Sequence, residues 1–145
     1  MLAVVAPLLA QAQSPAPAPA PAPNTETLPE HCRTFSFDKL PAHQSATGAI
    51  TRAVARGMTP TGEYVEIHET TLQPGQMPHP PHRHLHTEFA LIREGTIEFV
   101  MPDRSEQIGP GGVTYCASGE LHSVKNVGTV PANYFVVAIG KQVAL

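Results

Sequence analysis

Apolar and polar residues alternate with a period of two in several short stretches of this chain, and glycine or proline bounds most of them. The clearest stretch is 63–73, where Val65 and Ile67 share one face and Glu66 and His68 share the other. Further stretches with strand character are 33–38, 49–55, 82–86, 88–93, 96–101, 107–109, 113–116, 121–126 and 133–139. Residues 39–46 read as a polar connection and residues 57–62 as a turn.

The spacing of these stretches predicts an all-β fold with minimal helix, because no segment sustains a 3.6-residue period. Short strands separated by Gly/Pro turns are typical of a sandwich or a barrel. Residues 88–93 and 96–101 flank Glu94-Gly95 and predict a hairpin, whereas 33–38 predicts an edge strand. Residues 133–139 are the most continuously apolar, so we expect this strand to be central.

The N-terminal region has a different composition from the rest. Residues 1–12 form an apolar run that ends in Ala10-Gln11-Ala12, which predicts a secretory signal cleaved after residue 12. Residues 13–27 are rich in proline and alanine and predict a disordered, extended linker, which leaves 28–145 as a single folded domain. This organisation predicts an exported protein, periplasmic or extracellular. No Lys or Arg precedes the apolar run, so an apolar tail on a cytoplasmic protein is the alternative.

Composition narrows the possible partners. The chain has 145 residues, 14% of them charged, and a net charge of −3. It lacks a basic run and any nucleic-acid motif, which argues against nucleic-acid binding. No apolar stretch approaches the ~20 residues of a membrane span. The two cysteines, Cys32 and Cys116, allow one disulfide in an exported protein, and two separate buried thiols are the alternative.

Histidines and a carboxylate gather within ten residues of the sequence. His82 and His84 are two apart, so on a strand both imidazoles point to one face, and Glu88 follows closely. Imidazole and carboxylate together are ligands for a borderline divalent metal such as Mn, Fe, Co, Ni, Cu or Zn. His79 and His86 read as solvated surface residues.

Two spaced motifs in this region resemble those of the cupin superfamily. The first is His82-x-His84-x3-Glu88-x6-Gly95, with the leading glycine, Gly75, one position too far upstream. The second is Gly111-x5-Ala117-x-Gly119-x2-His122-x3-Asn126, with Ala117 where the family has proline. The resemblance covers roughly residues 63 to 140 and is that of a small, single-domain bacterial cupin.

This resemblance implies a double-stranded β-helix, or jelly-roll, barrel that holds one divalent metal ion per chain (Mn, Fe, Ni, Cu or Zn). The implied ligands are His82, His84, Glu88 and His122. It also implies a homodimer, since small cupins often pair through strands. Cupins with this ligand set include dioxygenases, decarboxylases and isomerases, and also proteins without a known reaction.

Two functions follow as hypotheses. We favour a metal-dependent enzyme, oxygenase-like or performing other metal-assisted chemistry, that acts on a small oxygenated organic molecule. The alternative is a non-catalytic module of the cell envelope that binds a metal or a small ligand. No catalytic residue is assigned, and His68, His79 and His86 are the acid–base candidates near the motif. Apolar residues that could line a ligand space, or simply belong to the core, are Phe99, Met101, Tyr115 and Phe135, with the small Ala90 leaving room beside the metal.

Overall fold

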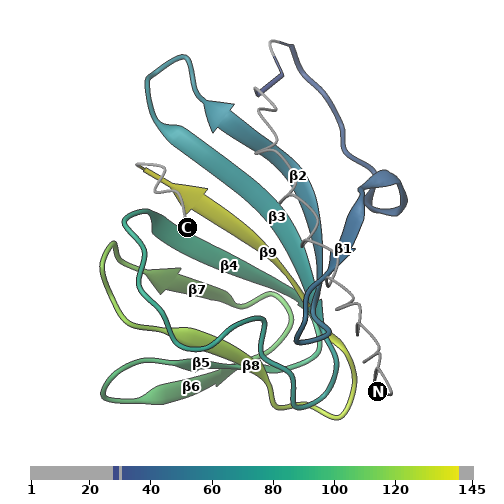
Figure 1. Cartoon of the computed structure of the whole chain (residues 1–145), viewed down its shortest axis with the longest axis vertical. Coiled ribbons are helices and arrows are strands. Elements are labelled where there is room, and N and C mark those ends of the chain that lie inside the picture. The colour runs from purple at the N-terminus through teal and green to yellow at the C-terminus, as the bar shows by residue number, and fades with distance from the viewer. Residues whose placement is uncertain (1–27, 30, 141–145) are drawn as a thin grey trace, which may run out of the picture.

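Two antiparallel β-sheets make up the fold in the computed structural model, which describes residues 28–29 and 31–140 (Figure 1). The larger sheet has the strand order β1 (Ala42–Gln44), β2 (Ile50–Met58), β3 (Tyr64–Leu72), β9 (Ala132–Ile139), β4 (Thr87–Glu94) and β7 (Val113–Cys116). The smaller sheet has the order β6 (Ser105–Ile108), β5 (Ile97–Val100) and β8 (Ser123–Asn126). In the described part of the chain the one helical element is a single 3-10 turn, η1 (Phe37–Lys39). The all-β prediction is confirmed.

The core lies between the inner faces of the two sheets. Leu72 of β3 and Ile97 of β5 are fully buried, and Tyr134 and Val136 of β9 pack with them. Alternation places these side chains inward, because successive residues of a strand point to opposite faces. The prediction that 133–139 is central is confirmed, since β9 lies between β3 and β4. Each sheet keeps two edge strands, so the jelly-roll arrangement is present without closure into a hydrogen-bonded barrel.

The predicted hairpin between 88–93 and 96–101 is wrong. β4 pairs with β9 and β7, whereas β5 pairs with β6 and β8, so the chain crosses from one sheet to the other at Gly95. Gly95 has φ 74°, and a Cβ there would lie 2.6 Å from Cα of Ala132. Glycine is therefore required at this crossing for both its backbone conformation and its small size.

Three further predictions about local structure are wrong. Residues 33–38 form no strand. Phe37 begins the 3-10 turn, and the Cζ atoms of Arg52 and Arg93 lie 4.5 and 4.6 Å from the centroid of its ring. The expected polar connection 39–46 contains β1, which pairs with β2. Residues 82–86 form a loop with one isolated bridge from His82 to His122. The signal segment 1–12 and the linker 13–27 lie outside the described residues.

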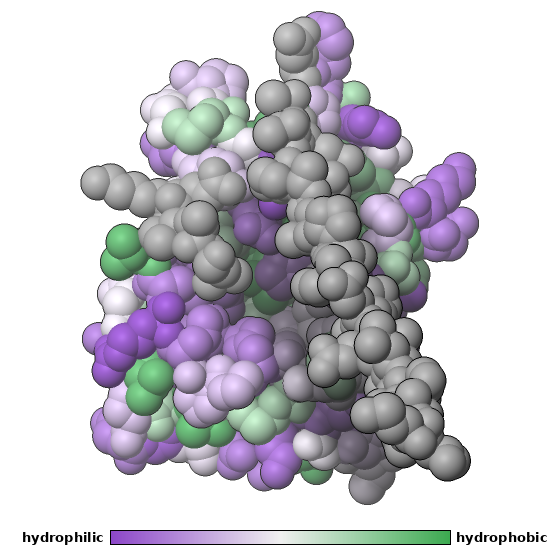
Figure 2. Space-filling model, viewed as in Figure 1, coloured by the Kyte–Doolittle hydropathy of each residue, from purple (hydrophilic) through white to green (hydrophobic). Residues whose placement is uncertain are grey.

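Polar side chains predominate on the face shown in Figure 2, and the apolar ones are scattered over it. Larger exposed apolar side chains occur on β4 and β7, where Leu91, Val113 and Tyr115 are 43, 53 and 59% exposed. Within the described residues, no helix has the length and apolar character needed to span a membrane.

Candidate metal centre

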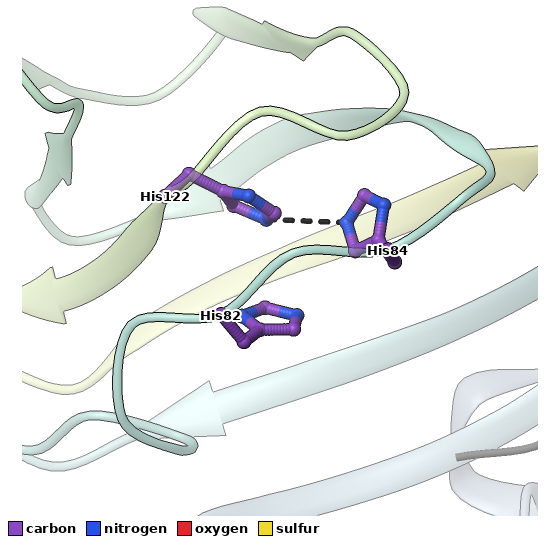
Figure 3. A group of neighbouring side chains, drawn as sticks. All are labelled: His82, His84 and His122. Atoms are coloured by element: carbon purple, nitrogen blue, oxygen red, sulfur yellow. Dashed lines mark hydrogen bonds between the residues drawn. The ribbon is translucent and has the colours of Figure 1, made fainter.

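The loop between β3 and β4 carries two of the predicted ligands and is fastened to the segment that joins β7 to β8. His82 and His122 exchange two backbone hydrogen bonds, each 3.1 Å long. The backbone N–H of Gly119 donates to the carbonyl of His84 at 2.8 Å, and the hydroxyl of Ser118 donates to the carbonyl of Leu85 at 2.7 Å. His122 comes directly before β8 rather than within it. These contacts, and not strand alternation, bring the imidazoles of His82, His84 and His122 together (Figure 3).

Backbone carbonyls fix the tautomers of two imidazoles. Nδ1 of His84 donates to the carbonyl of His86 at 2.9 Å, and Nδ1 of His122 donates to the carbonyl of Glu120 at 3.2 Å, because a carbonyl can only accept. In the neutral rings each Nε2 then carries a lone pair. The two Nε2 atoms are 3.2 Å apart and buried (Figure 3). Two lone pairs that face each other at this distance repel unless a cation lies beside both of them.

Glu88 adds a carboxylate from the start of β4. Its oxygens lie 3.3 Å from Nε2 of His84 and 3.8 Å from Nε2 of His122. Burial raises the pKa of Glu88, but the hydrogen bond with His86 and the nearby His84 and His122 outweigh it, so the net pKa lies below its usual value. The carboxylate is therefore charged at neutral pH, which suits a cation ligand.

His82 completes the group and remains uncharged. Its Nδ1 atom is buried and has no hydrogen-bond partner among the described residues. Burial, together with the neighbouring His79, His122 and His84, lowers the pKa of His82 to about 4, and Glu88 offsets this only in part. Burial likewise lowers the pKa of His84. Neutral imidazoles are the form that binds a metal.

The arrangement fits a single metal ion. The ligand atoms of His82, His84 and His122 all lie within 4.8 Å of one another. Two nitrogen ligands bound to one ion at about 2.1 Å are about 3.0–3.4 Å apart, which matches the 3.2 Å between the Nε2 atoms of His84 and His122. The structure thus brings the three predicted histidines together and places Glu88 against two of them.

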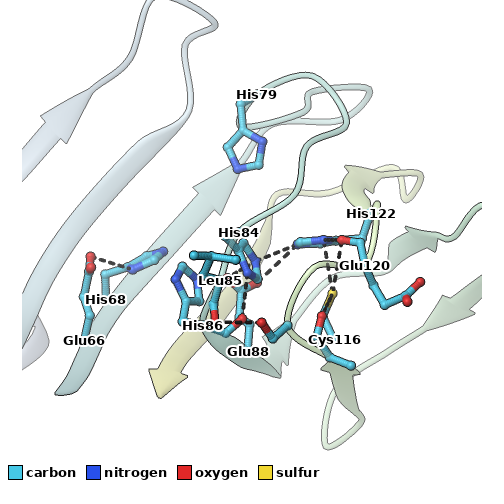
Figure 4. Close-up of polar contacts among 12 residues, drawn as sticks. Glu66, His68, His79, His84, Leu85, His86, Glu88, Cys116, Glu120 and His122 are labelled. Carbon is cyan, nitrogen blue, oxygen red and sulfur yellow. Dashed lines mark hydrogen bonds and ion pairs between the residues drawn. The ribbon is translucent and has the colours of Figure 1, made fainter. Parts of the chain in front are cut away.

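The sequence offered His86 as an acid–base candidate but not as a potential metal ligand. His86 forms a second group with His84 and Glu88 whose ligand atoms also lie within 4.8 Å of one another, and its Nε2 atom is 3.4 Å from Glu88 (Figure 4). Its ring stacks on that of His84 with centroids 3.7 Å apart. The spacing of two residues that joins His82 to His84 continues to His86, and this signal could have identified it. His79 also lies close, with its ring edge against His82.

A cavity of about 320 Å³ opens beside the cluster, with room for on the order of ten water molecules. His82, His84, Glu88 and His122 are among its lining residues, and its apolar walls include Val124 and Val136. The residues suggested as walls lie elsewhere. Phe99 is buried in the core, Met101 packs against the core, Tyr115 is exposed and Phe135 is half-buried. Ala90 shares the inner face with Glu88 and belongs to the core.

The two cysteines are separate thiols. Both cysteines are free, so the disulfide is absent; Cys116 is buried as the alternative expected, whereas Cys32 is exposed. The Sγ atom of Cys116 lies 3.1 Å from Nδ1 of His122, and burial, aided by Glu88 and Glu120, raises the pKa of the Cys116 thiol to about 11. The thiol therefore stays protonated behind the histidine and does not compete as a ligand.

Comparison with known proteins supports the resemblance of this chain to the cupin superfamily. Residues 68–138 match the family model described as a cupin domain. Among solved structures, an RmlC-like cupin from Shewanella frigidimarina is 11% identical with a TM-score of 0.63, covering 77% of this chain and 94% of its own. The polyketide cyclase RemF from Streptomyces resistomycificus is 21% identical with a TM-score of 0.60, covering 77 and 81%. A predicted oxalate decarboxylase from Thermotoga maritima is 19% identical with a TM-score of 0.62, covering 75 and 100%.

These likenesses show a cupin fold, and the proteins of similar structure include enzymes. None of the curated proteins matches the sequence. Identities this low carry no information on the substrate, so the function has to be argued from the site itself.

Proposed function

We propose that this protein binds one divalent metal ion through His82, His84, Glu88 and His122, and that it is a metal-dependent enzyme acting on a small oxygenated organic molecule. The observation that supports the metal is the pair of buried Nε2 lone pairs held 3.2 Å apart beside a carboxylate. The backbone carbonyls that fix both tautomers serve as the outer partners that metal-bound histidines use.

The proposed ligand set supports an enzyme rather than a structural metal site. Three imidazoles and one carboxylate leave one or two positions free on an ion that prefers five or six ligands. The adjoining cavity of about 320 Å³ would allow a substrate to reach those positions. When bound, the metal would act as a Lewis acid or, for Fe, Mn or Cu, support redox chemistry. The chain itself supplies the neutral imidazoles, the charged Glu88 and apolar walls that limit the access of water.

Metal content of protein purified without a histidine tag tests the first half of the proposal. We expect one equivalent of a divalent metal by elemental analysis. Substitution of His84 and His122 together by alanine should abolish it, whereas His43→Ala, at an exposed position of β1, should retain it. Stoichiometric metal in the double variant would exclude the assigned site.

Turnover tests the second half. Protein loaded with Fe or Mn is offered diketones, hydroxy acids, catechols and flavonols while O2 uptake and product formation are followed. We expect turnover of at least one class, and Glu88→Gln should suppress it far more than it lowers the free energy of unfolding. If the loaded protein binds a small ligand but turns over none, the non-catalytic binding module replaces the enzyme.

A further inference from the structure

A second polar group lies in the cavity, on a different strand from the proposed metal ligands. Glu66 and His68 of β3 both line the cavity, and Nδ1 of His68 is 3.6 Å from Oε1 of Glu66 (Figure 4). Nδ1 of His68 is buried and makes no closer polar contact with any described residue, so Glu66 is the acceptor available to it. The metal proposal uses neither residue.

Strand register sets the separation between this pair and the metal ligands. Ala138 of β9 is the register partner of Glu66 on one side and of Glu88 on the other. Two strand spacings therefore separate the backbones of Glu66 and Glu88, or roughly 10 Å. His68 is in register with Val136 of the same intervening strand. The cavity thus has a polar group at each side and short apolar side chains between them.

The carboxylate determines how His68 can bind a ligand. The nearby imidazole of His68 lowers the pKa of Glu66 despite the partial burial of its carboxylate, so Glu66 is charged at neutral pH. A charged carboxylate beside Nδ1 favours the tautomer that has its proton on Nδ1. In the neutral ring with that tautomer, Nε2 of His68 carries a lone pair that can accept a hydrogen bond from a hydroxyl group.

We propose that His68, oriented by Glu66, binds a hydroxyl group of the substrate while an anionic oxygen of the same molecule binds the metal. The inference rests on the proposed function and gives its substrate class: a small hydroxylated molecule with an apolar, ring-sized body between its two polar ends. His68 determines specificity through direct contact, and Glu66 is a positioning residue. The apolar strip of Ala138 and Val136 accommodates the body of the molecule.

Calorimetric binding of three probes to zinc-loaded protein tests this assignment. Benzoate supplies the carboxylate and the ring alone, whereas 3-hydroxybenzoate and 4-hydroxybenzoate add a hydroxyl that is too distant to chelate the same ion. We expect at least one hydroxybenzoate to bind roughly three- to tenfold more tightly than benzoate, the contribution of one hydrogen bond. His68→Leu should reduce that ratio to about 1 and leave benzoate affinity unchanged. Glu66→Gln should reduce the ratio in part.

Controls separate this inference from the metal proposal. His43→Leu makes the same exchange at an exposed site in β1 and should keep the wild-type ratio. Metal content is measured on every sample, so a protein that does not hold zinc contradicts the proposed function. A zinc-loaded protein that binds none of the probes, shows no preference for a hydroxyl, or keeps its preference in His68→Leu overturns the assignment of His68 alone.

Discussion

The side chain of Asn126 should contribute about 3 kcal/mol to the stability of the domain. Asn126 is fully buried at the end of β8. Its amide donates to the carbonyls of Leu72 and Val130, each at 2.9 Å, and its Oδ1 accepts from the N–H of Gly128 at 2.9 Å. These bonds tie β8 to the end of β3 and to the loop before β9, so they stabilise the strand that His122 precedes.

The magnitude follows from the number of bonds. Each hydrogen bond contributes roughly 0.5–1.5 kcal/mol net, so Asn126→Ala removes about 1.5–4.5 kcal/mol and leaves buried polar groups without partners. This is a large part of the roughly 5–15 kcal/mol that stabilises a typical domain. Asn126→Asp keeps the shape but turns an oxygen toward two carbonyl oxygens, so it should destabilise at least as strongly.

Urea unfolding of metal-free protein, followed by circular dichroism, measures the loss. Lys125→Ala is the matched control, because Lys125 is exposed in the same strand and its substitution should change stability by less than about 0.5 kcal/mol. A loss below about 1 kcal/mol for Asn126→Ala, or an Asn126→Asp variant as stable as the wild type, would refute the reasoning.

Three further outcomes are expected. Gly95→Ala should lower the free energy of unfolding in urea by at least about 2 kcal/mol, because a Cβ there would clash with Ala132. Gly75 has a similar φ but open space around it, so Gly75→Ala should cost less, and equal costs would contradict this reasoning. We propose a homodimer that pairs through the exposed side chains of Leu91, Val113 and Tyr115. Light scattering at micromolar concentration should give the mass of two chains, and Tyr115→Lys should shift the measured mass toward that of one chain. We also propose that the protein is exported and that residues 1–12 are removed. The intact mass of protein isolated from its native envelope tests this, and an uncleaved chain there would contradict it.

The sequence by itself located most of the strands and most of the cluster. Alternation is a local property, so it located β3 and β7 within a residue at either end and identified β9 as central. Motif spacing likewise selected His82, His84, Glu88 and His122, which the structure places side by side. These side chains come from two motifs that are separated in the chain, and backbone contacts between the two segments, rather than a strand period, bring the imidazoles together.

Tertiary structure decided which segments meet. The pattern around Gly95 fits a hairpin and a crossing equally well, and the contact with Ala132 and the pairing of β4 with β9 settled the crossing. Residues 33–38 alternate as a strand does, yet Phe37 lies in a 3-10 turn, where its ring contacts Arg52 of β2 and Arg93 of β4. Strand pairing depends on contacts distant in sequence, and no local period records them.

The same distinction holds within the site. His86 joins the cluster and His68 faces it from β3, although the sequence offered both only as acid–base candidates near the motif. The positions of both beside the cavity depend on the register of β3 against β9 and of β9 against β4. That register is fixed by burial of the apolar inner faces, because a shift of one residue would turn every inward side chain outward.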